Sequence, residues 1–136
     1  MKEMIRVVLV EPMKHPRLVE VEHTLENLQG LVGAYIAASY PWEDRVALVY
    51  DDDGKAKSDN LPNRLLEDYD LMVGPFFICG IDTEDFISIS DELAEKYMKK
   101  FWNIELFFRT EEGIVPIILV DDDEEEGAED EDESEG

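Results

Sequence analysis

Short apolar stretches, separated by charged residues and turn formers, run along this chain, and their spacing predicts mainly β-strands. The first strand-like run begins at Met4 and stops before Pro12, which is excluded from central strands. The next segment alternates apolar and charged positions, which is the pattern of a half-buried strand. By the same criteria, strands are expected at residues 4–11, 17–22, 35–40, 45–50, 76–79, 86–89, 104–109 and 114–120.

Two segments have the apolar spacing and the terminal residues of helices. Thr24 is a candidate N-cap for the first helix, and Gly33 is suited to the left-handed residue that ends it. Ser90 is the corresponding cap of the second helix, whose lysines gather toward its C-terminal end. Its inward stripe consists of residues spaced by four, namely Leu93, Tyr97 and Phe101.

These elements indicate an α+β protein, because only two good helices separate the strands. We expect a small mixed or antiparallel sheet packed with two main helices and followed by a C-terminal hairpin. The 136 residues suit one domain, which we place at residues 1–120. Residues 121–136 form a low-complexity acidic tail that cannot bury apolar surface and is expected to be disordered.

Acidic residues dominate the charge, with 35 acids against 12 bases and a net charge of −23. The last sixteen residues carry twelve of the acids and no base, so the remaining body is acidic as well. Such a surface repels phosphate backbones and anionic lipids, which argues against direct nucleic-acid binding and against a membrane partner. A single cysteine and the absence of a long apolar segment favour a cytoplasmic protein.

The acidic tail has two competing interpretations. In the first, the tail mimics a nucleic acid, with carboxylates in the place of phosphates. These carboxylates are spaced by about 4–5 Å when the tail is extended, whereas duplex DNA carries one charge per roughly 1.7 Å. The tail alone is therefore a poor mimic of a duplex. Alternatively, the tail keeps the protein soluble, because it directly follows the aggregation-prone strand at residues 114–120. Pro116 and an acidic flank are typical gatekeepers of such a strand. We favour the second interpretation.

Motifs for catalysis are absent from the sequence. There is no glycine-rich phosphate loop, no zinc-ligand spacing and no nucleophile elbow. Cys79 lies in an apolar run, which is more typical of a small buried group than of a nucleophile activated by His15 or His23. We therefore predict no catalytic residue, no cofactor and no metal site, and a role other than that of an enzyme.

The best candidate site follows Pro62, whose ring restricts the backbone before Asn63 and Arg64. A guanidinium on such a stiff loop can bind a carboxylate or phosphate through two parallel hydrogen bonds. The competing structural interpretation is that Arg64 pairs with nearby acids at positions 67, 68 and 70 and fixes the loop over the sheet. The candidate ligand- or partner-binding residues are Asn63, Arg64, Tyr69 and Gly74.

Five sequence blocks occur in an order and spacing that match a known family. They are residues 5–12 (IRVVLVEP), 24–36 (TLENLQGLVGAYI), 40–44 (YPWED), 61–64 (LPNR) and 69–80 (YDLMVGPFFICG). Through these blocks, residues 4–101 resemble the bacterial and phage family catalogued as domain of unknown function 3846. The resemblance implies an accessory protein of a phage or other mobile element, without an established activity. Family members more often have an acid at the position of Ala37, so no role of such an acid is expected here.

Three hypotheses about function remain after these observations. We favour a non-enzymatic binding or regulatory protein, which uses the Asn63–Arg64 segment to contact a partner that we expect to be a protein. The first alternative is an acidic, DNA-mimic-like inhibitor of host DNA-binding or restriction proteins. The second alternative is an enzyme or binder of a nucleotide-like anion, with Arg64 as the anion clamp. The sequence leaves the oligomeric state open.

Overall fold

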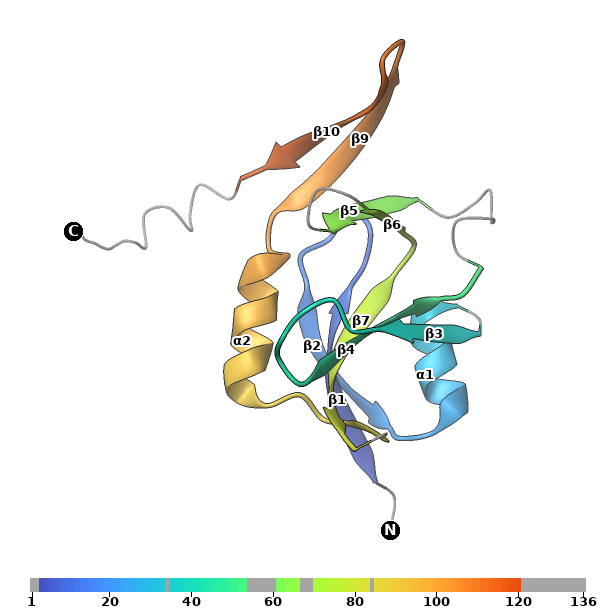
Figure 1. The fold of residues 1–136 in the computed structure, drawn as a ribbon, viewed down its shortest axis with the longest axis vertical. Helices are drawn as coiled ribbons and strands as arrows, with labels where there is room; N and C mark the ends of the chain where they lie inside the picture. The colour runs from blue at the N-terminus through green and yellow to red at the C-terminus, as the bar shows by residue number, and fades with distance from the viewer. Residues whose placement is uncertain (1–2, 34, 54–60, 67–69, 84, 121–136) are drawn as a thin grey trace, which may run out of the picture.

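The computed structural model describes residues 3–33, 35–53, 61–66, 70–83 and 85–120. At its centre lies a six-stranded sheet with the order β2-β1-β7-β4-β3, in which β8 also pairs with β7 (Figure 1). Every pairing within this sheet is antiparallel. Its strands are β1 (Met4–Val10), β2 (Arg17–Glu22), β3 (Ile36–Ser39), β4 (Val46–Asp51), β7 (Phe76–Asp82) and β8 (Asp85–Ile87).

Strand β7 joins two hairpins into one sheet. It pairs with β1 of the first hairpin on one side and with β4 of the second hairpin on the other. Helix α1 (Leu25–Val32) connects β2 at one edge to β3 at the opposite edge, so it must cross a face of the sheet. Helix α2 (Asp91–Lys100) lies on the other side of the sheet from α1 (Figure 1).

Each face of the central sheet is therefore covered by one helix. Alternate residues of β1, β4 and β7 enter two separate apolar clusters, one under each helix. Residues 76–80 are all buried for this reason, since the central strand has no solvent-facing side. Burial on both faces also explains why the sequence shows continuous apolar runs here instead of the alternation of a one-sided sheet.

Both helices begin as their sequences predict. The Thr24 hydroxyl accepts a hydrogen bond from the backbone N–H of Asn27 at 3.1 Å, and Gly33 ends α1 with φ of 101°. The Ser90 hydroxyl accepts from the N–H of Leu93 at 3.2 Å. Of the predicted inward stripe of α2, Tyr97 and Phe101 are buried; Leu93 is partly buried.

Two smaller sheets complete the described structure. One is the pair β5 (Pro62–Leu66) and β6 (Asp70–Val73). The other is the hairpin of β9 (Ile104–Thr110) and β10 (Gly113–Leu119), which follows α2 and projects from the body at the end remote from the N-terminus (Figure 1). The predicted α+β class, the two helices, the antiparallel sheet and the C-terminal hairpin are thus confirmed.

The sequence interpretation was wrong about residues 62–66. We expected Asn63 and Arg64 on a loop, but they lie in β5 and are fully buried. Apolar alternation could not predict this strand, because two of its three buried positions carry polar side chains. The strand expected at residues 86–89 is instead β8, which starts one residue earlier and ends at Ile87. Tyr69 and the acidic tail at residues 121–136 lie outside the described residues.

Candidate functional site

The guanidinium of Arg64 is buried, with a side-chain exposure of 0%, and all its hydrogen-bond donors are occupied. Nε and Nη2 both donate to the carbonyl oxygen of Phe101, at 3.2 and 3.0 Å. Nη1 donates to the backbone oxygen and to Oδ1 of Asn63, at 3.1 and 2.8 Å. Nη2 also donates to the carbonyl oxygen of Lys14 at 2.8 Å. A guanidinium has five N–H groups, so no donor remains for a ligand.

The side chain of Asn63 completes the same network. Its Nδ2 donates to the carbonyl oxygens of Val10, at 3.0 Å, and Gly74, at 2.9 Å. Its Oδ1 accepts from Arg64, so both hydrogens and the oxygen of the amide are used. Together the two side chains connect the end of β1, the turn before β2, the turn before β7 and the end of α2. We call this set of contacts the Asn63–Arg64 clamp.

The surroundings offset part of the cost of burying this cation. Burial lowers the pKa of Arg64 from its ordinary value, and the nearby carboxylate of Glu105 opposes this shift in part. The Phe101 carbonyl stands at the C-terminal end of α2, where the helix dipole is negative. The predicted partners at positions 67 and 68 lie outside the described residues, and the side chain of Asp70 is not described. An anionic ligand would have to displace the five internal hydrogen bonds, so the ligand-binding role of Asn63 and Arg64 stays a prediction that this geometry disfavours.

Gly74 has a backbone role in the clamp. Its φ is +81°, a conformation that glycine adopts without strain, and its N–H donates to the carbonyl oxygen of Leu61 at 2.8 Å. Its own carbonyl accepts from Asn63. Of the four candidate residues, the structure therefore brings Asn63, Arg64 and Gly74 together; Tyr69 lies outside the described residues.

Cys79 is buried in the sheet, as the sequence predicted. Burial raises the pKa of its thiol to about 12, which disfavours the nucleophilic thiolate. His15 stacks on the ring of Trp102 with 4.2 Å between ring centroids, and its Nδ1 lies 2.7 Å from the carbonyl oxygen of Trp102. Within the described residues no group of three or more His, Cys, Asp or Glu side chains has the arrangement of a metal site.

The residues around Trp42 form a further polar contact between the β3–β4 connection and α2. Asp44 Oδ2 accepts from Lys96 Nζ at 2.6 Å and from the Tyr97 hydroxyl at 2.8 Å. These two hydrogen bonds, that of Lys96 first, lower the pKa of Asp44. The ring of Trp42 lies beside that of Tyr97, with centroids 4.8 Å apart. The contact fixes the position of α2 on the sheet.

The C-terminal hairpin presents the largest set of exposed apolar side chains among the described residues. The β9–β10 register places Phe108 opposite Val115, Leu106 opposite Ile117 and Ile104 opposite Leu119. Since directly opposed residues share a face, these six apolar side chains lie on one face of the hairpin, and the Thr110–Gly113 pair continues that face at the turn. Four of them are 42–49% exposed, namely Phe108, Val115, Ile117 and Leu119. We call the six apolar residues of the three opposed pairs the apolar hairpin face.

The other face of the hairpin is mixed. It carries Glu105, Phe107 and Arg109 on β9, with Ile114, Pro116 and Ile118 on β10. Glu105 anchors the base of the hairpin, because its Oε1 accepts from the backbone N–H of Leu65 in β5 at 2.8 Å. The sequence predicted the hairpin but treated its apolar residues as an aggregation hazard. Register was the missing information, since it decides which side chains share a face.

Comparison with known proteins connects residues 5–102 to a family model described as a domain of unknown function (DUF3846). This range is nearly the one that the five sequence blocks indicated. It includes the central sheet, both helices and the Asn63–Arg64 clamp, and it ends before β9 begins at residue 104. No curated protein and no solved structure matches the chain. Of the helices that the structure describes, none has the length and apolar character needed to cross a membrane.

Proposed function

We propose that this chain, which belongs to the family described as a domain of unknown function (DUF3846), is a protein-binding module that holds its partner on the apolar hairpin face. The observation that carries the proposal is the exposure of this face, where four neighbouring side chains are 42–49% exposed. Contiguous apolar surface of this kind on a water-exposed protein marks an interaction site.

The position of the hairpin supports the same proposal. It begins two residues after the end of the family match, so it lies outside the part of the chain that the family model covers. Glu105 holds its base on β5, while the strands project from the body (Figure 1). A projecting two-stranded arm offers its face to a partner without any change in the central sheet.

Charge indicates the chemistry of the partner. The chain carries a net charge of −23, and twelve acids follow the hairpin within residues 121–136. Two copies of this chain would repel one another, whereas a basic protein would be attracted and oriented. Pro116 lacks an N–H and lies on the free strand of the hairpin, which disfavours extension of the sheet by another strand. We therefore propose a basic partner whose apolar patch is bordered by Lys and Arg side chains.

A DNA-mimic-like inhibitor of host DNA-binding or restriction proteins is the second candidate, because such proteins carry basic surfaces. The excess of 35 acids over 12 bases favours it. In both forms of the proposal the protein acts in the cytoplasm as an accessory protein of a phage or another mobile element. The two forms differ in one property: a mimic occupies the DNA site itself, so duplex DNA competes with it.

The decisive experiment compares two double variants on the same strand. Val115→Thr with Ile117→Thr alters the apolar hairpin face, while Ile114→Thr with Ile118→Thr is the matched control on the opposite face. Threonine keeps the β-branched shape that suits a strand. The native chain and both variants are used to capture partners from the native host at low and high salt. The main captured protein is then purified for direct measurement of Kd.

We expect a basic protein whose Kd rises by about tenfold or more with the face variant, because two buried anchors are lost, and changes little with the control. Higher salt weakens the complex, and deletion of residues 121–136 reduces that salt dependence. Equal effects of the two variants would refute the role of the hairpin face. If the native chain is a dimer and the face variant a monomer, the partner is a second copy and the basic-partner proposal is wrong.

A further inference from the structure

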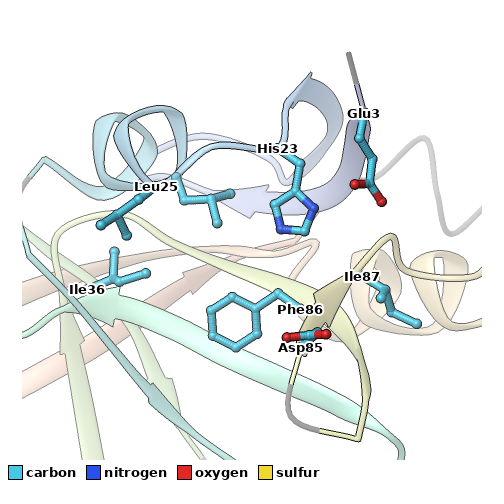
Figure 2. Close-up of a pocket in the computed structure, with 8 residues that line it drawn as sticks. Glu3, His23, Leu25, Ile36, Asp85, Phe86 and Ile87 are labelled. Atoms are coloured by element: carbon cyan, nitrogen blue, oxygen red, sulfur yellow. The ribbon is translucent and has the colours of Figure 1, made fainter. Parts of the chain in front are cut away.

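A pocket is lined by residues of α1, β3 and β8, by His23, which follows β2, and by Glu3, which precedes β1. These elements meet at the end of the molecule remote from the hairpin, as the ribbon in Figure 1 shows. Figure 2 shows His23 and Glu3 on one side of this hollow, Phe86 and Asp85 on the opposite side, and Leu25 with Ile36 toward one end. Its volume is about 470 Å³, within the range of small-molecule sites. We call it the Phe86 pocket.

The pocket exists because short elements leave part of the sheet uncovered. Helix α1 has eight residues, and its first turn covers only one border of the pocket. The opposite border is β8, which a two-residue turn folds back onto β7 with Thr83 at a φ of 56°. Gly80 permits the close approach of this segment, since a Cβ there would meet the Ser88 carbonyl oxygen at 2.8 Å. The missing Cβ of Gly80 thus allows β8 and the residue after it to lie close against β7.

The lining combines an apolar wall with an acidic rim. Five of the eight described lining residues are apolar, and one of these, Leu25, is 60% exposed. The carboxylates of Glu3 and Asp85 and the imidazole of His23 make no hydrogen bond or ion pair with any other described residue. Among the described residues that line the pocket there is no lysine or arginine.

Charge decides which ligand such a pocket prefers. Within the described part of the chain, the N-terminal end of α1 beside the pocket is positive, equivalent to about half a charge, and Glu26 in the first turn offsets it. Two full carboxylates outweigh that partial charge, and the whole chain is strongly acidic. A phosphate or carboxylate ligand is therefore disfavoured, whereas a cation finds two acceptors with unused lone pairs.

We propose that the Phe86 pocket binds an organic cation, namely an amine, amidine or guanidine attached to an apolar body. The apolar body packs on Phe86, Leu25 and Ile36, and the cationic group lies between Glu3 and Asp85. Alkyl and aryl amines and the basic side chains of peptides share this chemistry. The inference is independent of the hairpin, because no residue of the apolar hairpin face lines the pocket.

Three probes of equal shape and different charge test the proposal on the full chain: benzamidine, neutral benzamide and anionic benzoate. Binding is followed by chemical-shift changes of backbone amides in ¹⁵N NMR spectra. We expect benzamidine to bind saturably, with shifts concentrated at residues 23–28, 36 and 85–87. Benzamide should bind roughly threefold to tenfold more weakly, because it lacks the contribution of two partly exposed ion pairs. Nα-acetyl-arginine amide, added separately, reports whether a peptide side chain is accepted as well as a free amidine.

The variant Glu3→Gln with Asp85→Asn removes both rim charges and should weaken benzamidine by the same threefold to tenfold while leaving benzamide unchanged. The matched control is Asp82→Asn, which removes a carboxylate from the same β7–β8 hairpin outside the pocket. Phe86→Leu should weaken both probes, since it reduces the apolar wall. The proposal is overturned if benzamide binds as well as benzamidine, if the charge variant binds like the control, or if the shifts map to other residues.

Discussion

Replacement of Arg64 by methionine should destabilise this protein strongly, although the new side chain is similar in length and apolar. The variant removes five hydrogen bonds from a fully buried position. It leaves four oxygen atoms without these donors: the carbonyls of Phe101, Lys14 and Asn63, and Oδ1 of Asn63. Three of these oxygens belong to the backbone of different segments, so the loss loosens the junction of α2, β5 and the β1–β2 turn.

The magnitude follows from the nature of the clamp. A hydrogen bond to a charged group contributes about 1.5–3 kcal/mol, but five bonds from one group are not additive. Removal of a buried charge also recovers part of its desolvation energy. A buried acceptor that loses its donor costs about 1–3 kcal/mol, and these costs are not additive, so we expect a loss of about 3–5 kcal/mol for Arg64→Met. Lysine keeps the charge but has three donors in place of five, so Arg64→Lys should cost about 2–3 kcal/mol.

Urea unfolding at neutral pH, followed by the fluorescence of the two tryptophans, measures these free energies. Arg45→Met is the matched control, because the side chain of Arg45 is 72% exposed and its Nη2 lies 4.0 Å from Asp82. We expect the control to change the free energy of unfolding by about 0.5 kcal/mol or less. The reasoning is refuted if Arg64→Met loses less than about 1 kcal/mol, close to the control. If instead the native chain binds a nucleotide and a stable Arg64→Met protein does not, Arg64 is an anion clamp.

The remaining predictions concern two titratable groups. At mildly alkaline pH, the Cys79 thiol of the native protein should react with a disulfide reagent at least about 100-fold more slowly than that of the urea-unfolded chain. The reason is that burial raises the pKa of the thiol to about 12 and excludes the reagent. Rapid labelling of the native protein would show that Cys79 is not buried. The pKa of Asp44 should lie below its usual 3.8 in an NMR titration and rise toward that value in Lys96→Met. Because the pKa of Asp44 is lower in the folded state, its stabilisation is present above pH 3.8 and is lost as the pH falls through the folded pKa. If the pKa of Asp44 does not change in Lys96→Met, Lys96 is not the cause of the shift.

Local signals in the sequence were sufficient for most of the elements. Thr24, Gly33 and Ser90 act on their immediate neighbours, so the limits of the helices followed from them directly. Strands β1, β2 and β4 were predicted because apolar runs bounded by turn residues do not depend on the rest of the fold. Family membership was also contained in the order of short sequence blocks.

The role of the candidate site was not contained in local signals. Asn63 and Arg64 follow a proline and resemble an exposed loop in sequence, yet they form a buried strand. Their partners, Val10, Lys14 and Phe101, lie 37–53 residues away along the chain. Only the folded chain brings these carbonyl groups to one point, where they compensate for the burial of a cation.

The sequence by itself therefore determined the α+β class, the helices, the terminal hairpin and the acidic character, because these depend on neighbouring residues and on composition. The tertiary structure decided which surfaces are available for binding. It placed the Asn63–Arg64 clamp inside the protein, gathered six apolar side chains on one face of the hairpin, and formed the Phe86 pocket from four separate segments. Strand register and long-range packing produced each of these results, and neither can be read from the neighbours of a residue in the sequence.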